Sequence, residues 1–280
     1  MRSTNKFYRC YAKDLHRDKI YVAIKALKGN STRLAKQGIT WEIASLNRLT
    51  SKPPTSGVTL IHCAKLLSHF TFPGKGQDGD HLCIVTEVLG GDVKSLRASI
   101  PGTKKFFPLP LAKRILLHTL WGIAHMHSCG VVHTDLKLDN IMFDIGPVKN
   151  DYFISLTKTD PPRLHPPEES WDCIVQAAIS QPLPLPSLSE AMERTYIVAD
   201  FGSGEQYFRS CETSPYRIQH LVAQPAALHT VRNITANALR APEVILRGAW
   251  DEKVDIWIFG CLVCQATTIG SAAEADWCDF

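Results

Sequence analysis

The sequence has no long apolar run and no run of basic residues. Its longest strictly apolar stretch, residues 256–264, is nine residues long, whereas a membrane-spanning helix needs about 20. The first ten residues, MRSTNKFYRC, contain no apolar segment of the kind found in secretory signals. The formal net charge is only +4, and lysine and arginine are scattered along the chain. We therefore expect no membrane and no nucleic acid as a partner, and a location in the cytoplasm, the nucleus or both.

The cysteines lack the pattern of a disulfide framework or of a zinc site. There are nine of them, an odd number, spread over the whole chain, which suits free thiols in a reducing compartment. The only C-x-x-C pair is Cys261 with Cys264, and no second pair accompanies it. Two buried helical thiols are therefore a simpler interpretation of this pair than a metal or redox site.

The composition is that of an ordinary globular protein. With 280 residues, 45% of them hydrophobic and 21% charged, the chain is long enough for a sizeable core. Alternating apolar and β-branched residues predict strands at 20–27, 66–72 and 81–89. Residues 31–49 have apolar residues at helical spacing and predict one helix. The first part of the chain is thus expected to be mostly strand with one helix.

After Gly91 the pattern becomes helical. Apolar residues at helical spacing predict long helices at 110–128 and 254–267. The stretch 144–190 contains eight of the 17 prolines, so it is expected to be a surface insertion that resists helix and central strand. The order of these elements predicts an α+β fold with two lobes, a small strand-rich one and a mainly helical one.

The polar residues that suggest chemistry occur in three separate segments. The run VVHTDLKLDNIMFD places Asp135, Lys137 and Asn140 within six residues, where a carboxylate, an amine and an amide can address a hydroxyl, a phosphate and a metal together. Asp200 follows a short apolar strand in IVADFG. Lys25 lies within the strand VAIK, and a lysine in such an apolar context is costly to bury unpaired. Glu42, in the predicted helix that follows, is its natural partner.

Taken in order, these motifs resemble those of a eukaryotic protein kinase. VAIK, a helical glutamate, HTDLKLDN at 133–140, DFG at 200–202, APE at 241–243 and DIWIFG at 255–260 follow the order of that family. HTD in place of the commoner HRD, together with EVLG at 87–90, resembles the SR-protein kinase branch, in particular its fungal members. The resemblance implies a bilobal fold.

The two lobes are assigned by residue number on the same basis. Residues 1–90 would form the N-lobe and the hinge, and residues 91–280 the C-lobe with the proline-rich insertion at 144–190. The resemblance also implies that the chain transfers the γ-phosphoryl group of Mg·ATP to a protein serine or threonine hydroxyl.

The catalytic and metal-binding roles come from the same resemblance. Asp135 would orient the substrate hydroxyl and accept its proton, and Lys137 would neutralise the transferring phosphoryl group. Asn140 and Asp200 would hold Mg²⁺ against the nucleotide phosphates. Such a site works by positioning and by stabilising charge in an anionic transition state. Asp255 would accept backbone N–H groups of the loop 133–140, which we call the catalytic loop.

The nucleotide-binding roles are likewise implied. Lys25, paired with Glu42, would contact the α- and β-phosphates. Four residues would surround the adenine ring: Ala23 above it, Met142 below it, and the Glu87 carbonyl and the Leu89 amide at its edge. Phe201 and His133 would stack with Leu46 in an apolar column that aligns the two lobes.

The sequence departs from the family in two places. No glycine precedes Gly29, so the glycine-rich loop that covers the phosphates is missing, and we expect ATP to bind more weakly. After DIWIFGCLV the chain ends within about 20 residues, where the family continues with further helices. The resemblance therefore suggests a chain truncated at both ends. Arg/Ser-rich protein substrates, typical of the SR-protein kinase branch, are only weakly supported because their docking groove lies largely in that C-terminal region.

Other interpretations remain open. The departures suit a catalytically impaired, kinase-shaped binding or scaffold protein, or a truncated gene product. A small-molecule kinase of similar fold is disfavoured because APE followed by DIWIFG points to protein substrates. The full polar set favours an active protein kinase; it consists of Lys25, Glu42, Asp135, Lys137, Asn140 and Asp200. The oligomeric state is left undetermined.

Overall fold

The structure of the chain is a computed structural model. It describes residues 6–12, 20–54, 60–74, 79–103, 105–147, 150–161, 163–169, 174–175, 179, 181–203, 205–206 and 234–267. Among the helices in these ranges, none has the length and apolar character needed to cross a bilayer.

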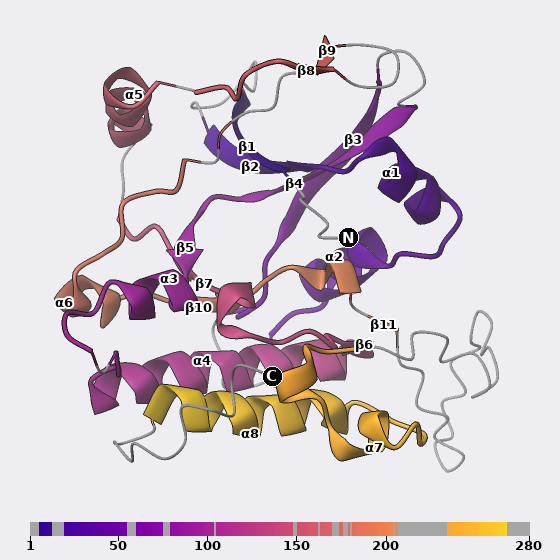
Figure 1. Cartoon of the computed structure of the whole chain (residues 1–280), viewed down its shortest axis with the longest axis vertical. Helices are drawn as coiled ribbons and strands as arrows, with labels where there is room; N and C mark the ends of the chain where they lie inside the picture. Colours follow the sequence, from indigo (N-terminus) through magenta and orange to yellow (C-terminus); the bar gives the residue numbers. More distant parts are fainter. Residues whose placement is uncertain are drawn as a thin grey trace.

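A four-stranded antiparallel sheet forms one end of the molecule (Figure 1). Its strands are β1 (Lys6–Ala12), β2 (Ile20–Ala26), β3 (Leu66–Pro73) and β4 (Asp80–Glu87), in the spatial order β1-β2-β4-β3. Every neighbouring pair is antiparallel. The three strands expected from the sequence are confirmed, and β1 adds a fourth that the sequence pattern did not single out.

Two helices, not one, pack beside this sheet. They are α1 (Gly29–Lys36) and α2 (Glu42–Ser51), so the single helix expected over residues 31–49 was wrong. The chain breaks at Gly38, which has φ +72°, a left-handed conformation that ends helices and that glycine adopts without strain. The break places Glu42 in the first turn of α2 rather than in the middle of a helix.

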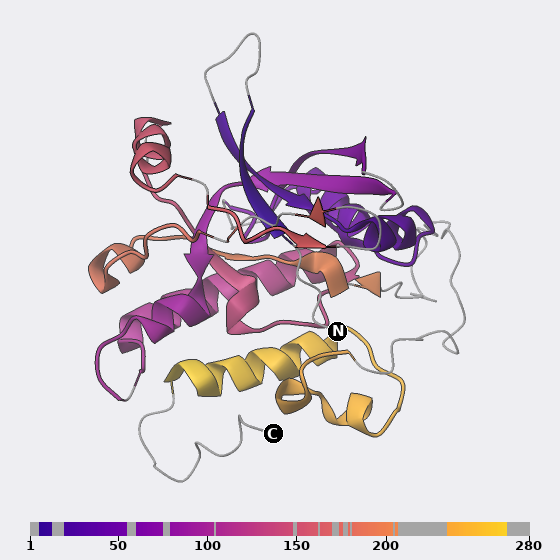
Figure 2. The same ribbon diagram turned by 45° about the horizontal axis from the view of Figure 1, so that its top comes forward.

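The other end of the molecule is mainly helical. The long helices α4 (Leu109–Ser128) and α8 (Lys253–Thr267) lie side by side in both views (Figures 1 and 2). Both match the helices expected at 110–128 and 254–267 within one residue. The shorter helices α3 (Val93–Ala98) and α7 (Pro242–Ile245) and the 3-10 turn η5 (Asn237–Leu239) complete this part.

Short strands lie between the two ends and carry the polar motifs. A three-stranded sheet has the order β10-β7-β5, built from β5 (Leu89–Asp92), β7 (Ile141–Asp144) and β10 (Tyr196–Val198). A two-stranded sheet pairs β6 (Val131–Val132) with β11 (Glu205–Gln206). The 3-10 turns next to these strands are η2 (Leu138–Asn140) and η3 (Phe201–Ser203).

The proline-rich insertion contains regular structure. Helix α5 (Asn150–Thr159) forms within it, followed by β8 (Glu168–Glu169), β9 (Ile174–Val175) and α6 (Leu188–Ala191). The expectation that this stretch resists helix was therefore wrong for α5. The reason is local: no proline occurs between Pro147 and Pro161, so the helix interior contains none.

One hydrophobic core joins the two ends, and the α+β fold class is confirmed. Its largest cluster includes Leu46 of α2, Ile84 of β4, Met126 of α4 and Ile258 of α8, all of which are buried. The expectation of two buried thiols in the C-x-x-C pair was wrong for Cys264, which is exposed on α8, whereas Cys261 is half-buried and packs against this core. The buried core residues of α8 in this cluster are Ile258, Leu262 and Ala266.

Candidate active site

A buried lysine lies between two carboxylates from distant parts of the chain. Lys25 is only 4% exposed in β2. Its Nζ donates to Glu42 Oε1 at 2.7 Å and to Asp200 Oδ1 at 2.8 Å. The predicted partnership of Lys25 with Glu42 is therefore present. The direct contact of Lys25 with Asp200, two residues after the end of β10, was not predicted from the sequence.

The electrostatics of these three groups reflect burial and mutual attraction. Burial lowers the pKa of Lys25, but the charges of Glu42 and Asp200 outweigh it, so the net pKa is raised. Burial likewise raises the pKa of Asp200, but the Lys25 charge and hydrogen bond outweigh it, so this pKa is lowered. For Glu42, burial prevails over Lys25 and raises the pKa. The lysine is thus held as a cation and Asp200 as an anion.

The catalytic loop brings a second polar group together. Lys137 Nζ lies 2.6 Å from Asp135 Oδ2. The Asn140 amide nitrogen donates to the Asp135 carbonyl at 2.8 Å and lies 3.4 Å from its Oδ2. Asn140 is buried, while Asp135 and Lys137 are partly exposed. Asp135, predicted to orient the substrate hydroxyl, and Lys137, predicted to neutralise the phosphoryl group, thus remain accessible. Asn140, a predicted metal ligand, lies deeper.

Strand pairing joins the two polar groups. In the antiparallel pair β7/β10, Ile141 lies opposite Val198. The hydrogen bonding continues one step further, because the amide of Ala199 donates to the Asn140 carbonyl at 2.8 Å. Asp200 is the next residue, so it lies at the same end of the strand pair as Asn140. The charge of Lys137 also contributes to lowering the pKa of Asp200.

Asp255 fixes the start of the catalytic loop. Its carboxylate accepts from the amides of His133 at 2.8 Å and Thr134 at 2.9 Å, as the sequence analysis expected. His127, at the end of α4, adds a third contact, with Nε2 lying 2.9 Å from Asp255 Oδ2. The contact of His127 with Asp255 was not predicted, because no local sequence pattern signals a contact across 128 residues.

The residues expected around adenine line up on neighbouring strands. Ala23 pairs with Thr86 across β2 and β4, and Leu89 begins β5 directly after the β4 strand that ends at Glu87. In β7, Met142 is half-buried between the buried Ile141 and Phe143, so its side chain projects to the opposite face of the strand from theirs. Burial raises the pKa of Glu87. Ala23, Glu87, Leu89 and Met142 are all half-buried.

Part of the expected apolar column is present. The rings of His133 and Phe201 lie with centroids 5.0 Å apart, and both side chains are fully buried. Leu46 of α2 belongs to the same buried cluster as Phe201. His133 Nε2 also lies 3.0 Å from the Ala199 carbonyl, which connects the column to the residue before Asp200.

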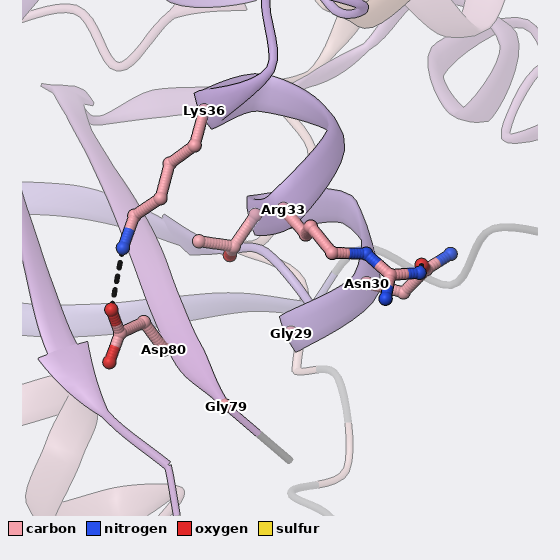
Figure 3. Close-up of a pocket in the computed structure, with 7 residues that line it drawn as sticks. Gly29, Asn30, Arg33, Lys36, Gly79 and Asp80 are labelled. Atoms are coloured by element: carbon pink, nitrogen blue, oxygen red, sulfur yellow. Dashed lines mark hydrogen bonds and ion pairs between the residues drawn. The ribbon is translucent and has the colours of Figure 1, made fainter.

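A separate pocket lies between α1 and the start of β4 (Figure 3). It is lined by Gly29, Asn30, Thr32, Arg33, Lys36, Gly79 and Asp80. Lys36 closes one side through an ion pair with Asp80 at 2.5 Å, and Arg33 turns toward Asn30. None of the predicted site residues lines this pocket.

Comparison with known proteins shows which family the sequence matches. The sequence model of the protein kinase domain matches residues 5–154. The chain is 27% identical over 88% of its length to the serine/threonine-protein kinase SRPK of Physarum polycephalum and spans 54% of that protein. It is 33% identical over 46% of its length to the serine/threonine-protein kinase SKY1 of Saccharomyces cerevisiae and spans 17% of it.

A third relative matches most of the chain. The dual specificity protein kinase CLK4 of Mus musculus is 26% identical over 89% of this chain, which spans 39% of CLK4. The chain thus spans about half or less of the length of these relatives. Since the family model covers more than half of the chain and the expected motifs meet in space, the chain belongs to the protein kinase domain family.

Proposed function

We propose that this chain is a protein serine/threonine kinase that transfers the γ-phosphoryl group of ATP to a hydroxyl of a protein substrate. One observation carries the proposal: Lys25, paired with Glu42, contacts Asp200, and Asp200 lies beside the end of the loop that holds Asp135 and Asn140. These residues come from separate segments, and a purely structural core has no need to gather them around one point. Residues 1–90 would act as the nucleotide-binding lobe and hinge, and 91–280 as the substrate lobe with its insertion at 144–190.

The chemistry follows from the position of each group. Asp135 orients the substrate hydroxyl and takes its proton while the oxygen attacks the γ-phosphorus and the bond to the β-phosphate oxygen breaks. Lys137, 2.6 Å from Asp135, would neutralise charge on the phosphoryl group in transfer. Lys25 binds the α- and β-phosphates, and Glu42 keeps its amine in place.

The donor atoms suit Mg²⁺. Asn140 uses its amide nitrogen to bond the Asp135 carbonyl, so its amide oxygen is the atom that can bind a cation. With the carboxylate of Asp200, held as an anion, this gives two hard oxygen ligands, and Mg²⁺ in nucleotide sites is held by one or two such side chains together with phosphates. Bound there, Mg²⁺ would neutralise negative charge on the nucleotide.

The remaining assignments concern the adenine site, the protein substrate and the cellular location. The half-buried Ala23, Met142, Glu87 and Leu89 would surround adenine. The substrate is a protein with a serine or threonine hydroxyl. Arg/Ser-rich substrates are the finer possibility that the resemblance offers. The cytoplasm or the nucleus is the proposed location.

The test is transfer of radiolabelled phosphate from Mg·ATP to a generic serine-containing protein. Asp135→Asn removes the proton acceptor but keeps the shape, so we expect kcat to fall by about 10²- to 10⁴-fold. The matched control is Asp139→Asn in the same loop, because Asp139 is exposed and pairs with the exposed Lys94 at 3.0 Å. This control should retain activity.

A second measurement separates binding from chemistry. Thermal stabilisation by Mg·ATP should persist in Asp135→Asn and disappear in Lys25→Met. Transfer that survives Asp135→Asn overturns the proposed mechanism. Nucleotide binding without any transfer by the wild-type chain would instead favour the kinase-shaped binding protein considered above.

A further inference from the structure

The insertion at 144–190 reaches back to the strand that carries Lys25. Helix α5 packs against β2, and the ring of Phe153 stacks on that of Tyr21 with centroids 4.6 Å apart and planes inclined by 30°. Phe153 is only 5% exposed, although it belongs to a surface helix. Figures 1 and 2 show α5 standing beside the sheet end of the molecule, apart from α4 and α8.

Tyr21 lies on the functional face of β2. Side chains alternate along a strand, so Tyr21, Ala23 and Lys25 project to one side, and Lys25 meets Glu42 and Asp200 on that side. The last pair of the β2/β4 register is Val22 with Glu87, which places Tyr21 beside Val88. Val88 links β4 to β5, at the proposed hinge.

The two ends of the insertion also lie next to the proposed hinge. Asp144 lies opposite Leu89 of β5. The amide of Asp144 donates to the Thr195 carbonyl at 3.0 Å, and the Thr195 amide donates to Asp144 Oδ2 at 3.1 Å. Further along, Leu185 packs close to Gly91 of β5, since a Cβ placed on Gly91 would lie 3.5 Å from Leu185 Cδ2. The insertion therefore contacts both sides of the hinge.

We propose that Phe153 is a positioning residue for ATP: through its stack on Tyr21, helix α5 holds β2 in place and closes the hinge edge of the nucleotide site. The inference rests on the proposed function, because the site it closes is the one that Ala23 and Lys25 would line. A ligand between two elements binds more tightly when those elements are held in place beforehand. The stack ties β2 to a segment anchored on β7, which carries Met142 on the opposite side of the site.

The expected effect is on nucleotide affinity more than on chemistry. In Phe153→Ala the Kd for a fluorescent ATP analogue with Mg²⁺, and the KM for ATP, should rise about three- to tenfold. The kcat should stay within about twofold, since Phe153 touches no reacting group. Phe153→Tyr keeps the ring and should restore wild-type affinity. The matched control is Phe72→Ala, because Phe72 of β3 likewise contacts a ring of a neighbouring element, that of His81 on β4.

A second measurement, hydrogen exchange, and a second variant, Tyr21→Ala, complete the test. Hydrogen exchange of residues 20–26 should quicken in Phe153→Ala and not in Phe72→Ala. If Phe153→Ala does not fold, Tyr21→Ala, which removes the other ring, takes its place, and it should give the same loss of affinity and the same faster exchange. Unchanged Kd and unchanged exchange in the folded variant overturn the inference.

The failure of the proposed function gives a different result. If the wild-type chain and Lys25→Met bind the nucleotide equally poorly, the proposed function fails, and the role of Phe153 in ATP binding fails with it. If binding depends on Lys25 but not on Phe153, only the inference is overturned. The exchange arm reports on the docking of α5 in either case.

Discussion

Asp255 is one side chain on which the shape of the catalytic loop depends. Its carboxylate is fully buried and accepts two loop amides, while His127 provides a third contact. Thr134 has φ +65°, a left-handed conformation that costs a non-glycine residue about 1 kcal/mol or more. The hydrogen bonds to Asp255 stabilise this conformation, and with it the orientation of the next residue, Asp135.

Asp255→Asn should therefore be costly despite its similar shape. An NH₂ group would replace one acceptor oxygen and face hydrogen-bond donors in a buried place. We expect the free energy of unfolding, measured by urea titration, to fall by about 2–4 kcal/mol. Asp251→Asn is the control, because Asp251 accepts the Lys253 amide at the start of α8 and asparagine serves as well there. Equal stability of the two variants would contradict the role of Asp255.

The sequence predicts single residues well where the motif is continuous. Asp135, Lys137 and Asn140 lie in one short run, and the structure brings them into contact as expected. Contacts between distant segments leave no such local pattern. The Lys25–Asp200 contact spans 175 residues, and the Tyr21–Phe153 stack joins a strand to an insertion. Only the fold brings these side chains together, so the sequence analysis did not find them.

Two helical glycines show how packing decides the effect of one substitution. Gly122 of α4 lies against the segment before β3, where an added Cβ would be 2.6 Å from the His62 carbonyl oxygen and 2.8 Å from Val198 Cγ2. The carbonyl cannot easily move, because it accepts the Val198 amide at 2.8 Å. At Gly260 of α8, an added Cβ would meet no atom within 4 Å among the described residues, apart from its chain neighbours and the backbone of its own helix.

Alanine at these two positions should change stability in opposite directions. Gly260→Ala should raise the free energy of unfolding by up to about 1 kcal/mol, since alanine favours the helix. Gly122→Ala should lower it by about 1–3 kcal/mol, because overpacking outweighs the same helical gain. Urea unfolding of each variant checks this. Shifts of the same sign in both would show that helix propensity, and not the contact of α4 with His62, decides the outcome.

The success of sequence analysis for whole elements follows the regularity of the pattern. Helices α4 and α8 have long periodic stretches and were predicted within one residue. The break between α1 and α2 falls at Gly38, within an apolar pattern that continues through it. Helix α5 was not predicted because the high proline content of the whole stretch 144–190 argued against helix. The segment between Pro147 and Pro161 contains no proline and can form one.

At the scale of the whole molecule, a buried aromatic cluster joins the segment before β3 to α4 and β10. His62 and His118 lie with ring centroids 4.5 Å apart, and both contact Trp121. The Tyr196 amide donates to His118 Nδ1 at 3.0 Å, and His62 Nδ1 donates to the Tyr196 carbonyl at 2.9 Å. Because Nδ1 of His118 accepts this bond, His118 must be neutral in the folded protein or lose it.

Acidification should therefore loosen this junction. Burial lowers the pKa of His118 to about 4 from 6.5, with His62 and Arg114 adding to the effect and Asp144 opposing it. The folded state then binds fewer protons than the unfolded state, so the contribution of His118 is complete above pH 6.5 and is lost as the pH falls toward 4. We expect the free energy of unfolding to fall by on the order of 2 kcal/mol over that window.

His118→Asn tests this, because its oxygen can accept the Tyr196 amide without titrating, and it should flatten the pH dependence of the free energy of unfolding. The control His69→Asn, at an exposed position in β3, should leave that pH dependence unchanged. An equally steep acid loss in His118→Asn would exclude His118 as its origin.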